Sequence, residues 1–169
     1  MSDPEWPPIT ELIPHAHDAI LIDRIIAHDP NRTIVEVRPA TRPMLRRADE
    51  SVPAWLAIEY MAQAIAAHEG MVAWTAGRRI PIGYLISATN VRFHAERFDS
   101  GTPLRVSSER VRGRPGLGAL SHRCSITRMG DDDPEIPLAE GSLSIAIDPA
   151  SRGETFPEPA TTTNARSRT

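Results

Sequence analysis

The longest apolar pattern in the chain occupies residues 53–75, PAWLAIEYMAQAIAAHEGMVAWT. Most of these residues are good helix formers, Pro53 suits a first helical position, and Gly77 follows where a left-handed cap is favoured. The apolar residues surround the expected helix, which predicts burial on nearly all sides. Glu59 and Gln63 interrupt this surface on one face, one turn apart. A buried carboxylate is costly unless it is paired or functional, so Glu59 is the leading candidate for chemistry.

Six further segments have the apolar or alternating pattern of β-strands. They are 19–27 and 33–38 before the helix, and 82–93, 104–112, 119–129 and 138–147 after it. Turn residues separate them, so the strands are expected to pair mainly antiparallel. We therefore expect an α+β domain whose sheet wraps the helix, with a second subunit covering the remainder.

The domain boundaries follow from where this patterning stops. Residues 9–148 contain all the predicted elements, whereas 1–8 form a Pro-rich stretch that predicts a flexible arm. Residues 149–169 contain no segment that could pack, which predicts a disordered tail. The chain is thus expected to be one domain with two extensions.

Composition narrows the class of protein. The net charge of −3 gives no argument for nucleic-acid binding, and no apolar run approaches the roughly 20 residues that span a bilayer. The N-terminal MSDPEWPP lacks the features of a signal peptide, so a cytoplasmic protein is expected. No His, Cys and carboxylate spacing indicates a metal site. The single Cys124 alternates with apolar neighbours and is expected to be a buried packing thiol.

Three strings carry a resemblance to a known family: LIPHAHDAILIDR at 12–24, VPAWLAIEYMAQ at 52–63, and the stretch 83–105 with NVRF at 90–93. In this order they resemble the 3-hydroxyacyl-ACP dehydratases of fatty acid synthesis, which have the hot-dog fold. The IEYMAQ and AIAAHEG strings are most similar to the divergent branch associated with aryl polyene biosynthesis. The resemblance extends over about residues 9–148.

The resemblance implies a lyase that needs no cofactor and dehydrates a 3-hydroxyacyl thioester, carried by acyl carrier protein or coenzyme A, to a trans-2-enoyl thioester. Glu59 matches the family's helix carboxylic acid and Gln63 its helix glutamine. Ala54 matches the glycine at the helix start, where backbone N–H groups polarise the thioester carbonyl. With the adjacent Trp55, Ala54 and Gln63 are the expected substrate-binding residues. Burial raises a carboxyl pKa, which suits Glu59 to the role of acid.

The chain departs from the family at the catalytic base. The family's His lies about fourteen residues before the helix carboxylate, and here that position is Leu45. Two sources of a base stay open. One is His15 or His17, with His15 favoured by its match to a family His. The other is a second chain, since in this family the His and the carboxylate of one site come from different subunits, here a homodimer or a heterodimer with another hot-dog protein.

Two alternatives to a dehydratase follow from the missing His. A hot-dog thioesterase uses a helix carboxylate to activate water and would release a free acid and a thiol. A non-catalytic subunit would instead stabilise an active hot-dog partner. The product formed by the purified protein separates these alternatives from the preferred dehydratase.

Overall fold

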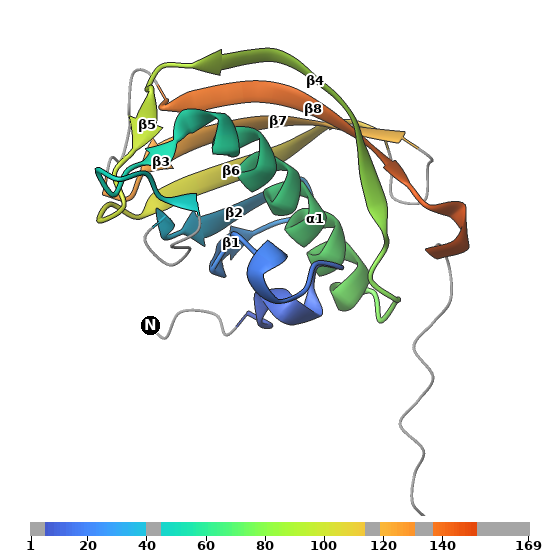
Figure 1. The fold of residues 1–169 in the computed structure, drawn as a ribbon. Helices are drawn as coiled ribbons and strands as arrows, with labels where there is room; N and C mark the ends of the chain where they lie inside the picture. Colours follow the sequence, from blue (N-terminus) through green and yellow to red (C-terminus); the bar gives the residue numbers. More distant parts are fainter. Residues whose placement is uncertain (1–5, 40–44, 114–118, 131–136, 152–169) are drawn as a thin grey trace, which may run out of the picture.

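A long helix, α1 (Ala57–Thr75), lies in the concave face of a curved antiparallel sheet (Figure 1). The computed structural model describes residues 6–39, 45–113, 119–130 and 137–151. The sheet has six strands in the order β1-β2-β6-β7-β8-β4. Their bounds are Arg24–His28 (β1), Arg32–Val37 (β2), Leu104–Arg112 (β6), Ala119–Arg128 (β7), Ala139–Ile147 (β8) and Gly83–Phe93 (β4). This arrangement confirms the predicted α+β hot-dog class and its order of elements.

Two local predictions differ from the structure, and one small sheet was not predicted. The segment 19–27 becomes a strand only at Arg24, because residues before it first form a 3-10 helix, His17–Ala19, and then cross α1. A 3-10 turn, Ala54–Leu56, precedes α1, so Pro53 stands before the helix in the short strand β3 (Val52–Pro53). This strand pairs with β5 (Arg97–Phe98), a two-stranded sheet too short to show in the hydrophobic pattern.

The core lies between α1 and the concave face of the sheet. Inward residues of β7 and β8 alternate with half-exposed ones, as a half-buried strand requires. Cys124 is one of these inward residues and is buried, as predicted, and burial raises the pKa of its thiol to about 12. Most of α1 is buried as well, which matches its apolar residues on all sides.

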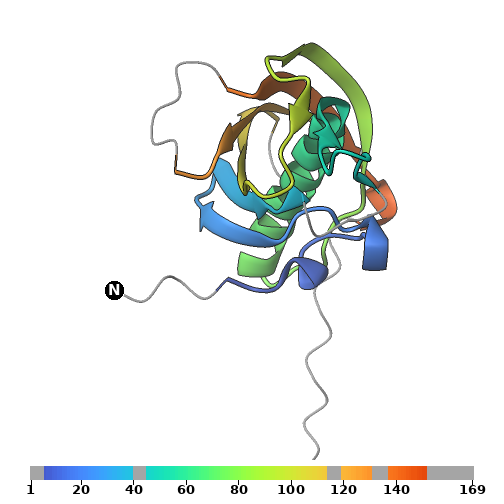
Figure 2. The ribbon, with the colours of Figure 1, turned by 60° about the vertical axis from the view of Figure 1, so that its left-hand side comes forward.

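Strand β4 is the exception to this packing. It forms one edge of the sheet, pairs only with β8 among the described strands, and is exposed along nearly its whole length (Figure 2). The side chains of Tyr84 and Ile86 are 60% and 58% exposed, and Leu85, Ile82 and Phe93 are also exposed. Large apolar side chains along a strand edge form a surface of the kind used in protein–protein contacts.

The two predicted extensions fall largely outside the described residues, which exclude 1–5 and 152–169. Where the structure describes them, Trp6 contacts the His28 ring and Pro149–Ser151 form a 3-10 helix. None of the helices in the described ranges is long and apolar enough to cross a membrane.

Candidate active site

An N-terminal strap, residues 12–21, crosses the outer side of α1 and is held at both ends. At its start, Leu12 packs so tightly on Gly70 that a Cβ at Gly70 would lie 2.0 Å from the Leu12 carbonyl oxygen. Only glycine permits this approach. At its end, the Gln63 side chain accepts a hydrogen bond from the Leu21 N–H at 2.8 Å and donates one to the Ala19 carbonyl at 2.7 Å. These contacts fix the path of the strap.

Gln63 also orients the candidate acid. Its Nε2 donates a hydrogen bond to Glu59 Oε1 at 2.8 Å, so one buried amide connects the strap to the carboxylate one helical turn away. The expected proximity of Glu59 and Gln63 is therefore confirmed. Full burial of Glu59, however, is wrong for the single chain: its side chain is 46% exposed, because a cavity separates this side of α1 from strands β4 and β8.

The strap brings His15 to Glu59. His15 Nε2 lies 3.9 Å from Glu59 Oε1, and the other ring nitrogen, Nδ1, is buried without a hydrogen-bond partner among the described residues. Both side chains line a cavity of about 340 Å³. A histidine and a carboxylate thus share one cavity within a single chain.

The cavity follows α1 and opens beside strand β4. Ala62 and Ala66 line its helix side, and Leu85 of β4 and two residues of β8, Ile145 and Ile147, line the opposite side. These walls are apolar, whereas the end near the strap carries Glu59 and His15. An apolar cavity with few convergent polar groups is the usual form of a small-molecule site.

The structure does not bring the other predicted residues into this cavity. His17 lies on a separate cavity with Trp6 and Arg24. Trp55 is 61% exposed on the molecular surface. The N–H of Ala54 donates to the Glu96 carbonyl at 3.2 Å. Their roles remain predictions from the resemblance.

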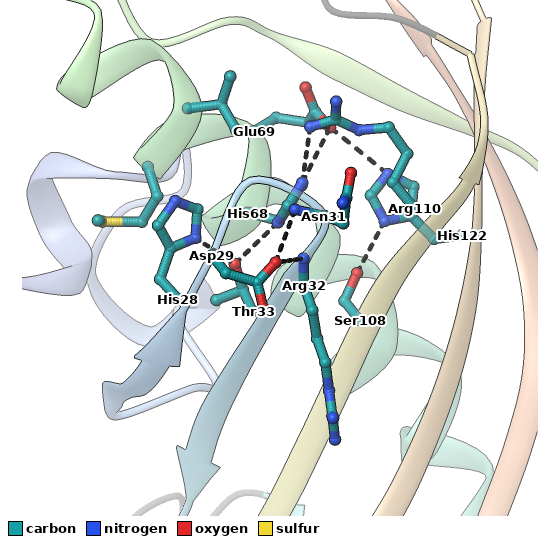
Figure 3. Close-up of polar contacts among 12 residues, drawn as sticks. His28, Asp29, Asn31, Arg32, Thr33, His68, Glu69, Ser108, Arg110 and His122 are labelled. Atoms are coloured by element: carbon teal, nitrogen blue, oxygen red, sulfur yellow. Dashed lines mark hydrogen bonds and ion pairs between the residues drawn. The ribbon is translucent and has the colours of Figure 1, made fainter.

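A second polar cluster, which the sequence did not reveal, surrounds Glu69 near the other end of α1 (Figure 3). Glu69 Oε1 lies 3.3 Å from Arg110 Nη2 and 3.4 Å from His122 Nε2, and all three side chains are at most 8% exposed. His122 in turn hydrogen-bonds Ser108 through Nδ1 at 2.9 Å. Glu69 also lines the cavity that holds Glu59.

His68 completes this cluster as a neutral side chain. Arg110 Nη2 lies 2.7 Å from His68 Nε2, and since arginine only donates, this nitrogen must be the acceptor. His68 Nδ1 then donates to Thr33 Oγ1 at 2.8 Å, and Thr33 bonds His28 Nδ1 at 2.7 Å. Burial lowers the pKa of His68 to about 3, which agrees with this neutral form.

The neighbours of Glu69 stabilise its ionised form. Burial alone raises the pKa of this carboxyl, but the approach of His122 and the charge of Arg110 outweigh it and leave the pKa below its usual value. The described residues contain no group of three His, Cys or carboxylate side chains placed to hold a metal ion. Glu69 and Arg110 thus form a buried ion pair beside the neutral ring of His68.

A curved antiparallel sheet around one long helix, with an apolar cavity along that helix, is the architecture of hot-dog proteins. A model of the ApeP-like family, described as ApeP dehydratase, matches residues 7–154. The chain belongs to this dehydratase family, which confirms the resemblance seen in its sequence strings. No protein with a curated description matches the chain.

Several solved structures share the fold. The dehydratase heterocomplex ApeI:P from Xenorhabdus doucetiae matches with a TM-score of 0.77 at 21% identity, over 87% of this chain and 95% of the other. The PaaI protein from the phenylacetic acid degradation operon of E. coli matches with a TM-score of 0.52 at 12% identity, over 72% and 80%. A hypothetical thioesterase with coenzyme A from Streptococcus pneumoniae matches with 0.52 at 11%, over 74% and 84%.

Proposed function

We propose that this protein dehydrates a 3-hydroxyacyl thioester to a trans-2-enoyl thioester, with Glu59 as the acid and His15 as the base. The observation that carries the proposal is the approach of His15 Nε2 to within 3.9 Å of Glu59 Oε1 in a shared cavity. The hydrogen and hydroxyl that leave are on neighbouring carbons, so the acid and the base must lie close together. Membership of a dehydratase family supports the same reaction.

The proposed reaction returns both side chains to their starting states. Neutral His15 takes the C2 proton, and the electrons of that C–H bond move to the thioester carbonyl as an enolate. The enolate forms the C2–C3 double bond, the C3–O bond breaks, and the departing oxygen takes the proton of Glu59 and leaves as water. His15 then passes its proton to Glu59, which their short separation favours.

A second hot-dog subunit seated on β4 is part of the proposal. The exposed apolar side chains of Tyr84 and Leu85 belong to this edge, and both residues line the cavity. A chain on β4 would therefore cover the cavity as well as the strand. It would also bury Glu59, and burial favours the protonated carboxyl that an acid requires. The similar ApeI:P structure is described as a heterocomplex, which supports a heterodimer.

The thioester carrier is proposed to be acyl carrier protein, as the family resemblance implies. A dehydration assay tests the function: the protein, co-purified with any hot-dog subunit that it binds, is given 3-hydroxyacyl thioesters of acyl carrier protein and of coenzyme A. We expect an enoyl thioester without release of free thiol, and faster turnover on the protein carrier. Released thiol and free acid would instead support a thioesterase.

The source of the base is tested with a matched pair of variants. His15→Ala should reduce kcat by about 10²- to 10⁴-fold, the usual contribution of a general base. His17→Ala should leave kcat nearly unchanged, because His17 faces another cavity. Equal activity of both variants and the unmodified protein would place the base on the partner subunit and overturn this assignment.

A further inference from the structure

The cavity has a carboxylate at each end, and only one of them is used by the proposed reaction. Glu59, Ala62, Ala66 and Glu69 follow one another along the same side of α1 and all line the cavity. Glu69 lies ten positions after Glu59, which corresponds to a rise of about 15 Å along the helix axis. An acyl chain that starts between His15 and Glu59 and follows the apolar wall is thus directed toward Glu69.

Glu69 cannot easily move out of the path of such a chain. Its Oε1 lies between Arg110 and His122, and its side chain is 7% exposed. Ser108 holds His122, and Thr33 holds His68, so the groups around the carboxylate are themselves fixed (Figure 3). Among the described residues, Oε1 has charged and polar neighbours at 3.3–3.9 Å but no hydrogen bond of standard geometry. This oxygen therefore still lacks a well-placed donor from the described part of the chain.

A methyl group pressed against this carboxylate would remove its remaining solvent contact and supply no hydrogen bond in return. Such desolvation is costly for a charged group, whereas each methylene in the apolar part of the cavity gains free energy. We propose that Glu69 is a specificity-determining residue that forms a charged end wall and limits the length of an apolar acyl chain. This inference rests on the proposed function, because it assumes that the cavity holds an acyl thioester.

A substrate series on the unmodified protein tests the end wall. Saturated 3-hydroxyacyl thioesters on one carrier are compared, each two carbons longer than the last. We expect kcat/KM to rise with length and then to fall by about tenfold or more at the chain that reaches Glu69. The same chain with a terminal hydroxyl group, which can donate to Glu69, should recover most of that loss. A smooth rise or plateau with no recovery by the hydroxyl would overturn the inference.

Two variants and a control locate the effect. Glu69→Gln keeps the shape of the side chain and removes its charge, so the fall at long chains should become several-fold smaller. Glu109→Gln removes an exposed carboxylate that pairs with Arg123 outside the cavity, and its length profile should match that of the unmodified protein. Ala66→Leu fills the middle of the cavity without touching the cluster around Glu69, so its limit should move to shorter chains.

The outcomes separate the two proposals. Dehydration of all lengths at similar kcat/KM would support the proposed function and overturn the end wall. No dehydration of any acyl thioester by the unmodified protein with its partner would overturn the proposed function itself. If Glu69→Gln does not fold, the substrate series and Ala66→Leu still test the end wall, since neither alters the cluster around Glu69. An unchanged length limit in Ala66→Leu would show that the acyl chain does not follow this cavity.

Discussion

The side chains of Glu59 and His15 come from two segments that are far apart in sequence, and each is oriented by a different restraint. Gln63 holds the carboxylate of Glu59 by a 2.8 Å hydrogen bond along α1. His15 has no such bond at Nδ1, so its position follows from the path of the strap. The geometry of the pair therefore depends on the contacts that fix the strap on the helix.

Glu59→Gln tests the acid directly. The amide is nearly the same size as the carboxyl but cannot donate a proton as an acid, so we expect the fold to be retained and kcat to fall by about 10²- to 10⁴-fold. Formation of the enoyl thioester measures kcat, and circular dichroism checks the fold. Glu50→Gln, a change at an exposed residue paired with Arg46, is the matched control. Unchanged turnover of Glu59→Gln would show that another group protonates the hydroxyl.

Gly70→Ala tests the strap. Alanine favours helix over glycine by about 1 kcal/mol, but its Cβ would lie 2.0 Å from the Leu12 carbonyl oxygen and force the strap to move. We expect a net loss of about 1–3 kcal/mol in the free energy of unfolding by urea. Gly101→Ala, with no atom within 4 Å of the added Cβ, should be close to neutral.

The same variant should also reduce kcat, because the displaced strap carries His15. If Gly70 acts through His15, adding Gly70→Ala to His15→Ala should cause little further loss of kcat. A loss of full size in the double variant would show that Gly70 contributes to activity by another route. This double-mutant comparison separates positioning from stability.

At the scale of elements, the packing of α1 against β2, β6 and β7 buries the ionised carboxylate of Glu69 beside the neutral ring of His68. Burial holds the pKa of His68 at about 3, against an ordinary value of 6.5, although Glu69 acts in the opposite direction. Between these two pH values the unfolded chain binds a proton at His68 and the folded chain does not. The free energy of unfolding must therefore fall as the pH falls through this window.

We expect acidification from pH 7 to pH 4 to destabilise the protein strongly, with His68 contributing up to about 3 kcal/mol. The depressed pKa of Glu69 adds a loss only below about pH 4.5, the ordinary value of its carboxyl. Urea unfolding at several pH values measures the effect. His68→Gln removes the titrating ring and should give a shallower slope between pH 6.5 and 4.5. An identical slope would show that His68 does not control this window.

The elements differ in how far the sequence could define them. The helix, its Glu59–Gln63 pair and the alternating strands follow from local periodicity. The path of the strap does not follow from local periodicity. Residues 19–23 have the apolar side chains of a strand, but contacts with Gln63 keep this segment out of the sheet. The cluster around Glu69 depends on the register that sets Arg110 opposite His122 in β6 and β7, which no local pattern encodes.

At the scale of the whole molecule, Glu59 and β4 are exposed for the same reason, since both border one cavity. Apolar residues all round α1 led to the expectation of burial on nearly all sides, yet the side with Glu59 faces a cavity that β4 borders. In the proposed assembly the covering surface lies on another chain, so its identity could not come from this sequence. The family resemblance supplied the prediction of a partner, and the exposed edge supports where it binds.

Ile86→Asp tests this interface. A charged side chain in the middle of the exposed face of β4 should weaken association with a hot-dog partner by tenfold or more, since a charge would be buried without a pair. Val111→Asp, at an exposed apolar residue on β6, is the control and should leave association unchanged. Analytical ultracentrifugation of the mixed subunits gives the association state. Equal weakening by both variants would place the interface elsewhere.

The open edge of β4 also affects the amount of protein that a cell can maintain. A chain with this apolar strand uncovered presents an unpaired row of backbone groups, which favours aggregation. A binding partner stabilises the folded form by mass action, so the abundance of this chain should follow the abundance of its partner. Synthesis of the two subunits in matched amounts should then raise the yield of this chain.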